Sequence, residues 1–154
     1  MSTPAACSGS THVIYASQTG AKLDSDVLQG GGTDDTAVLQ AVLDRAPSEG
    51  SIVLVMDGAA LVRGLHVHSN TTIHCLNPSC GFYLADGSDA PILSNAHPHK
   101  EQRLDRNITL IGGTYNQNCL KQIHHHADNT LVVGMAFFGI ENLLVRDVTI
   151  RNQR

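Results

Sequence analysis

The sequence predicts an all-β solenoid, in which short parallel strands stack as the successive coils of a β-helix. Apolar pieces of three to five residues follow one another, each bounded by Gly, Asn, Asp or Ser. A strand that begins with Asn recurs at Asn70, Asn107 and Asn142, with spacings of 37 and 35 residues. Aromatic content is low, with three Phe, three Tyr and no Trp, and stacked coils are filled by short aliphatic side chains. Three unrelated strands in an ordinary β domain are the alternative explanation of the repeat.

The N-terminal third is expected to contain a tail, a loop and one helix. Residues 1–12 are a flexible tail rich in Ser, Thr and Ala, and residues 13–154 form one domain that begins with a strand at Val13–Ala16. A loop from Gly20 to Gly32 follows. The helix is predicted over residues 34–46, capped by Thr33, Asp34 or Asp35. Its apolar stripe consists of Val38, Leu39, Val42 and Leu43, and Pro47 and Gly50 end it.

Beyond the helix the apolar pattern becomes that of short strands. Helical patterns do not alternate with these strands, which argues against a doubly wound α/β sheet. In a solenoid, equivalent strands lie about 4.8 Å apart, so the three Asn side chains are expected to stack in a ladder. The strands are expected at Ile52–Val55, Leu61–Val62, Leu65–Val67, Thr71–Ile73, Gly81–Leu84, Ile108–Ile111, Leu131–Val133, Leu143–Val145 and Val148–Ile150.

Composition excludes several classes of protein. Charged residues make up 16% of the chain and the formal net charge is -4, so a basic face for nucleic acid is not expected. No apolar stretch reaches the roughly 20 residues of a membrane span. The N-terminus lacks the pattern of a secretory signal, so the protein is expected to be cytoplasmic as written, or secreted if a leader lies outside the chain.

Five segments resemble the N-terminal part of the pectin-lyase-like right-handed parallel β-helix superfamily, and most of all glycoside hydrolase family 28, the polygalacturonases. They are Gly20–Lys22, Gly32–Ala37, Ser69–Ile73, Asn107–Tyr115 with Asn118, and Glu141–Asn152. The resemblance implies that the helix caps the N-terminal end of the coil stack. Two departures are the extra loop at Leu23–Gly30 and Met56-Asp57-Gly58 in place of a Pro-x-Gly.

The resemblance implies that the parent protein hydrolyses a pectin-like acidic polysaccharide with inversion. Such enzymes carry Asn-x-Asp, Asp-Asp, Gly-His-Gly and Arg-x-Lys motifs on later coils, and none of the four is present here in that context. We therefore expect an N-terminal portion, truncated at its C-terminal end, that is inactive by itself. A non-catalytic glycan-binding or structural β-helix, such as a tail fibre or adhesin, and a polysaccharide lyase on the same fold stay open as alternatives.

We assign no catalytic, cofactor-binding or metal-binding residue from the sequence. The adjacent pair Asp34-Asp35 is interpreted as a helix cap rather than a catalytic dyad. His124-His125-His126 is interpreted as a polar loop rather than a metal site. His66 and His68, with His74 nearby, are interpreted as a solvated outer face, with a metal site or a pH-sensitive surface as the alternative.

A cysteine pair and a glycine run are interpreted as structural, and the last strand is interpreted as a surface for self-association. Cys75 and Cys80 enclose a turn and are free thiols in a cytoplasmic protein or a disulfide in an exported one. Gly30-Gly31-Gly32 is interpreted as a flexible turn rather than a phosphate-binding loop, because no Lys-Ser or Lys-Thr follows it. The last strand, at Val148–Ile150, is expected to leave an open edge through which chains self-associate end to end.

Overall fold

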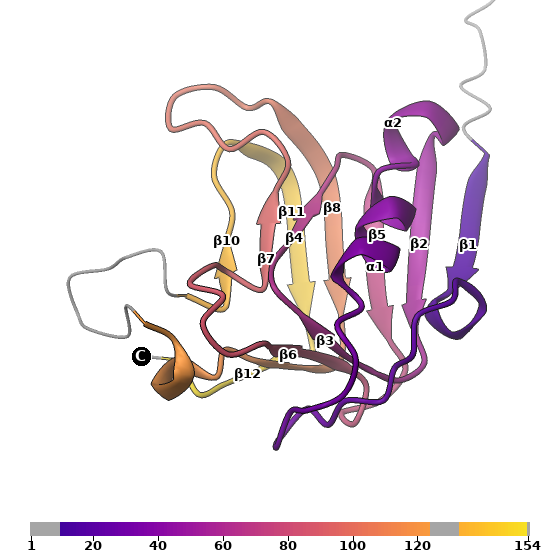
Figure 1. The fold of residues 1–154 in the computed structure, drawn as a ribbon. Coiled ribbons are helices and arrows are strands. Elements are labelled where there is room, and N and C mark those ends of the chain that lie inside the picture. The colour runs from indigo at the N-terminus through magenta and orange to yellow at the C-terminus, as the bar shows by residue number, and fades with distance from the viewer. Residues whose placement is uncertain (1–9, 124–132, 154) are drawn as a thin grey trace, which may run out of the picture.

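A computed structural model describes residues 10–123 and 133–153, which form three parallel sheets and two α-helices (Figure 1). The five-stranded sheet has the order β1-β2-β5-β8-β11, with β1 Thr11–Tyr15, β2 Ser51–Met56, β5 Thr71–Cys75, β8 Asp105–Ile111 and β11 Ile140–Arg146. The four-stranded sheet has the order β12-β9-β6-β3, with β3 Ala59–Val62, β6 Gly81–Leu84, β9 Thr114–Asn116 and β12 Thr149–Arg151. The three-stranded sheet has the order β10-β7-β4, with β4 Leu65–Val67, β7 Leu93–Asn95 and β10 Met135–Ala136.

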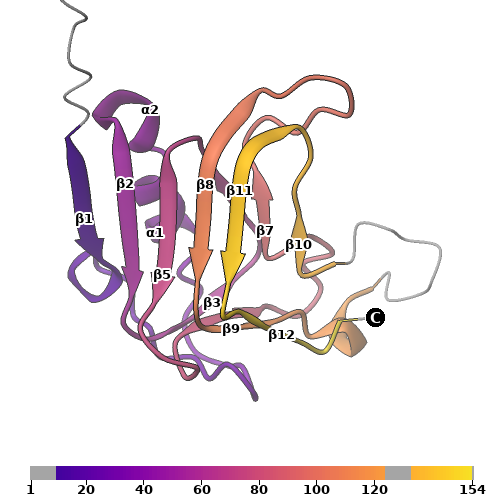
Figure 2. The same cartoon turned by 180° about the vertical axis from the view of Figure 1, so that it is seen from behind.

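All strand pairs between these elements are parallel, and the three Asn-led strands are neighbours in the five-stranded sheet (Figure 2). The expected Asn stack is confirmed. Asn107 Nδ2 donates to Asn70 Oδ1 at 3.0 Å, and Asn142 Nδ2 donates to Asn107 Oδ1 at 3.1 Å. All three residues have positive φ, between 56° and 63°, a conformation that Asn tolerates better than most residues.

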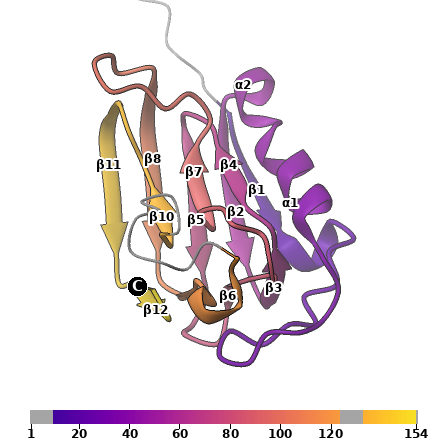
Figure 3. The ribbon, with the colours of Figure 1, turned by 60° about the vertical axis from the view of Figure 1, so that its left-hand side comes forward.

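The predicted helix over residues 34–46 is present as two shorter helices, α1 Thr36–Leu43 and α2 Ala46–Glu49. The prediction that Pro47 ends the helix is wrong, because Pro47 lies in the first turn of α2, where its missing N–H has no intrahelical partner to lose. Gly50, with φ of 95°, does follow the end of α2. Figure 3 shows both helices on the same side of the five-stranded sheet.

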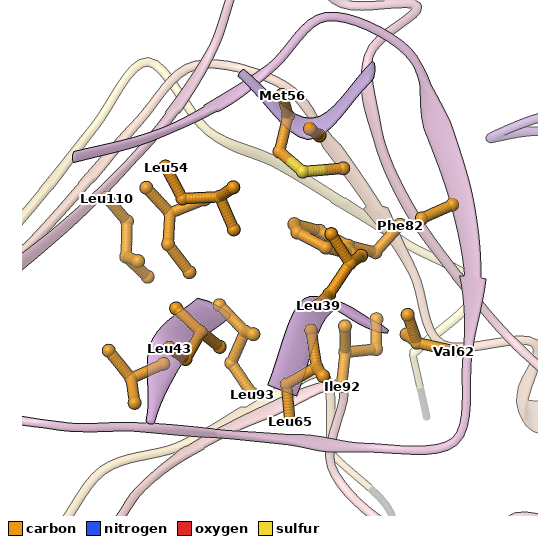
Figure 4. Packing of buried hydrophobic residues seen from close by; sticks show 14 of the residues in the cluster. Leu39, Leu43, Leu54, Met56, Val62, Leu65, Phe82, Ile92, Leu93 and Leu110 are labelled. Carbon is orange, nitrogen blue, oxygen red and sulfur yellow. The ribbon is translucent and has the colours of Figure 1, made fainter. Parts of the chain in front are cut away.

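The core lies between the sheets and α1 (Figure 4). Leu39 and Leu43 of α1 are fully buried and belong to the same cluster as Leu54 of β2 and Phe82 of β6. Phe82 packs against Tyr115 of β9, with ring centroids 5.2 Å apart. The alternation of buried and partly or fully exposed residues along β5, and along β8 from Asn107 onward, follows the two-residue period of a strand with one face on the core.

The predicted fold class, an all-β solenoid with one capping helix, is wrong. The described residues form three separate parallel sheets with a helix whose apolar stripe is part of the core, an α/β-like arrangement. The Asn repeat correctly identifies three equivalent strands of one sheet, but it contains no information on where the intervening strands lie. The strands β7, β9 and β10 were not predicted at all, because each has only two or three residues and none has the apolar-x-apolar pattern of the equally short β4.

Most other strands begin or end within a few residues of their predicted positions, and β6 has its predicted bounds. Strand β8 begins three residues before the predicted Ile108, and strand β11 begins three residues before the predicted Leu143. Of the strand expected at Leu131–Val133, the first two residues lie outside the described part of the chain.

Candidate functional site

An open groove of about 390 Å³ lies on the outer side of β3 and β6. It combines an aromatic ring, two basic side chains and two polar side chains around a glycine-rich wall. The lining residues used below are Gln29, Gly31, Arg63, Tyr83, Asp86 and Lys121.

Tyr83 reaches the groove because successive side chains of a strand point to opposite faces. Phe82 and Leu84 are buried in the core, and Tyr83 between them is only partly covered. Burial raises the pKa of the Tyr83 hydroxyl, and the nearby carboxylate of Asp86 raises it further, so the hydroxyl is neutral near pH 7 and can donate a hydrogen bond.

The glycine-rich loop packs directly on this ring. A Cβ at Gly30 would lie 2.4 Å from Tyr83 Cε1, and the φ of Gly30 is 74°, so both the contact and the backbone require glycine. Gly30 therefore packs against the aromatic ring and Gly31 lines the groove, a role that the sequence interpretation as a flexible turn did not include.

Arg63 and Lys121 place two positive charges at the groove. The Arg63 side chain is 55% exposed, its Nε lies 3.1 Å from Asp34 Oδ2, and its Nη1 donates to the backbone carbonyl of Asp86 at 3.4 Å. A guanidinium has five N–H donors, so donors remain for a ligand. Lys121 is exposed at the end of a short 3-10 turn, and no ion pair of its ammonium occurs among the described residues.

The carboxylate of Asp86 is held by the side chain of Asn118. Asn118 has φ of 51° and is almost fully buried. Its Nδ2 donates to Asp86 Oδ1 at 2.8 Å and to the Leu84 carbonyl at 3.0 Å. This buried amide positions one polar wall of the groove relative to β6.

The pair Asp34-Asp35 has a structural role. Asp34 caps the helix as predicted, whereas the side chain of Asp35 does not. Asp34 accepts the backbone N–H of Thr36, the first residue of α1, at 2.9 Å. Asp35 caps nothing with its side chain and instead accepts the N–H groups of Lys22 and Leu23, at 2.7 and 2.9 Å, which ties the preceding loop to the helix.

Charge also argues against a catalytic acid at this pair. Burial raises the pKa of Asp34, but hydrogen bonds from Thr36 and the Arg63 guanidinium outweigh it and hold that pKa below its ordinary value. A general acid of a glycosidase needs a raised pKa instead. Asp34 is therefore ionised at neutral pH and cannot supply a proton.

The other residues singled out in the sequence lie apart from this groove. His66 Nδ1 lies 2.9 Å from Ser94 Oγ. His68 Nε2 lies 2.9 Å from Asp44 Oδ1, so these two histidines contact other side chains. His124-His125-His126 lies outside the described residues. Cys75 and Cys80 are buried free thiols, and burial raises the pKa of Cys75 to about 12.

Sequence reasoning missed the three side chains that define the groove, Arg63, Tyr83 and Lys121. The position of Tyr83 between Phe82 and Leu84, which are more apolar, was the only signal in the sequence that Tyr83 faces outward from its strand. Arg63 and Lys121 are 58 residues apart, so only the fold brings them to one site.

No family model matches the chain, and no curated protein or solved structure matches it. The resemblance to the polygalacturonases is therefore carried by the five short segments alone. Within residues 10–123 and 133–153, no helix has the length and apolar character that crossing a bilayer requires.

Proposed function

We propose that the chain is part of a polysaccharide-degrading glycosidase of the polygalacturonase type, and that its Tyr83 groove binds a pectin-like acidic glycan. The observation that carries the proposal is the combination of Tyr83 with Arg63 and Lys121 in one open groove. An aromatic ring offers an apolar face and a polar edge to a sugar ring. Arginine and lysine pair with the carboxylates of an acidic sugar.

The shape of the groove supports a chain-like ligand. It is open to solvent on the outer side of β3 and β6, so a long polymer can lie across it without threading an end into a closed pocket. Gln29 and the Tyr83 hydroxyl add hydrogen-bonding groups for sugar hydroxyls.

We propose that these residues bind the glycan without cleaving it. Inverting hydrolysis requires an acid with a raised pKa and a base about 6.5–9.5 Å away. The Asp34 carboxyl beside the groove has a lowered pKa, and Asp86 is held by Asn118. In this proposal, residues outside the groove catalyse the hydrolysis of the glycan.

The test is binding of oligogalacturonides to the full chain, measured by isothermal titration calorimetry, beside a reducing-end assay. We expect binding that weakens with added salt, and no release of reducing ends. Tyr83→Ala should lower the affinity about tenfold or more, and Lys121→Gln should lower both the affinity and its salt dependence.

Lys100→Gln is the matched control, because Lys100 is exposed and lies outside the Tyr83 groove. Equal affinity for Tyr83→Ala, Lys121→Gln and Lys100→Gln would place any binding elsewhere and refute the site. Preference for a neutral glycan over oligogalacturonide would refute the substrate class.

A further inference from the structure

A second cleft, of about 220 Å³, lies near the start of β8 and brings together two histidines that are distant in the sequence. It is lined by His68, which follows β4, by His97, which follows β7, and by Ser69 and Asp105. The two imidazole rings face each other edge to face, with centroids 6.0 Å apart.

Each imidazole is oriented by a carboxylate. His68 Nε2 lies 2.9 Å from Asp44 Oδ1, and His97 Nδ1 lies 3.0 Å from Asp105 Oδ1. An ionised carboxylate only accepts hydrogen bonds, so the ring nitrogen donates in both pairs. In the neutral imidazoles, the lone pairs are therefore on His68 Nδ1 and His97 Nε2.

The two carboxylates are themselves held in place. Gln40 Nε2 donates to Asp44 Oδ1 at 2.8 Å. Asp105 is 2% exposed and accepts the Asn95 amide and the His97 backbone N–H, both at 2.8 Å. Metal-binding histidines are commonly supported in this way, because a carboxylate sets the tautomer and raises the basicity of the ligating nitrogen.

The distance between the rings fits one shared ion. A metal ion about 2.1 Å from a ring nitrogen lies about 3.2 Å from the ring centroid, so two rings that share it have centroids at most about 6.4 Å apart. The observed separation of 6.0 Å is within this limit. The His97 side chain is 61% exposed, so a hydrated metal ion can reach its ring from solvent.

We propose that His68 and His97 bind one divalent transition-metal ion between them, with water in the remaining coordination positions. Imidazole nitrogens suit Zn²⁺ and Cu²⁺, and Cu²⁺ is expected to bind more tightly. No group of three or more His, Cys, Asp or Glu side chains able to hold a metal ion occurs among the described residues, so this is an open site with two protein ligands. The proposal is independent of glycan binding.

The experiment titrates the full chain, without an affinity tag, with CuCl₂ and with ZnCl₂ by calorimetry. The same titration of His124→Ala/His125→Ala/His126→Ala removes the contribution of that histidine run. We expect this triple variant to keep one Cu²⁺ equivalent whose electron paramagnetic resonance spectrum shows coupling to two nitrogens.

In that background, His68→Ala and His97→Ala should each lower the Cu²⁺ affinity at least tenfold, and the double substitution should lower it little further, because one ion is shared. Asp44→Asn should lower it about tenfold through loss of the supporting carboxylate. His74→Ala is the matched control and should leave it unchanged, because His74 lies on β5 and does not line the cleft.

Unchanged affinity in His68→Ala or His97→Ala would overturn the proposal. Independent, additive losses would overturn it as well, because they would indicate two separate sites. Circular dichroism and thermal melting of each variant establish that it is folded before its affinity is compared.

Discussion

Replacing Leu39 with alanine tests the structural role of α1 most directly. Leu39 is fully buried and points into the cluster that contains Leu65 and Phe82 (Figure 4). A fully buried Leu→Ala substitution loses the transfer free energy of the removed carbons and leaves a cavity, at a cost of about 3–5 kcal/mol. A Leu39 side chain exposed to solvent would lose much less on the same substitution.

The assay is urea unfolding followed by circular dichroism, with thermal melting beside it. For a chain of this size, a cost of about 3–5 kcal/mol lowers the melting temperature by roughly 6–20 °C. The matched control is Leu120→Ala, because Leu120 is 78% exposed and its loss should change the free energy of unfolding by less than about 0.5 kcal/mol. A cost below about 1 kcal/mol for Leu39→Ala, with an unchanged urea slope, would refute the placement of α1 in the core.

Three further predictions follow from the Asn stack, a buried carboxylate and the exposed edge. Asn107→Ala should cost about 2 kcal/mol, from two hydrogen bonds and a positive φ, and Asn107→Gly only about 1 kcal/mol in the same urea assay; equal costs would exclude a contribution from φ. Burial raises the pKa of Asp105, but hydrogen bonds from His97 and Asn95 hold this pKa below its ordinary value of 3.8. Asp105 therefore stabilises the fold fully at a pH above 3.8, and this contribution is lost as the pH falls through the folded-state pKa. Asp105→Asn should therefore flatten the acid side of a stability-against-pH curve, and an unaltered slope there would contradict the assignment. Strands β11 and β12 lie at the edges of their sheets in the described part of the chain, and their side chains Leu143, Val145 and Ile150 are 41–44% exposed. Sedimentation should therefore show concentration-dependent self-association, which Val145→Lys weakens. A monomer at every concentration would exclude this self-association.

The sequence alone determined those features that depend on local chemistry. The stripe of Leu39, Val42 and Leu43 predicts a helix because these side chains recur at the period of a helix. The Asn residues that begin three strands predict their own stacking, because Asn adopts positive φ and pairs with another amide. The short apolar segment Gly81–Leu84, next to turn-forming residues, predicts β6 with its observed bounds.

Only the tertiary structure decided the fold class and both candidate sites. Whether α1 covers the strands or packs among them depends on the partners of Leu39 and Leu43, which are far away in the sequence. Arg63 meets Tyr83 and Lys121, and His68 meets His97, only because parallel strands return to neighbouring positions after long connections. A pattern within one segment reports the face that the segment buries, but not which distant segment lies against the other face.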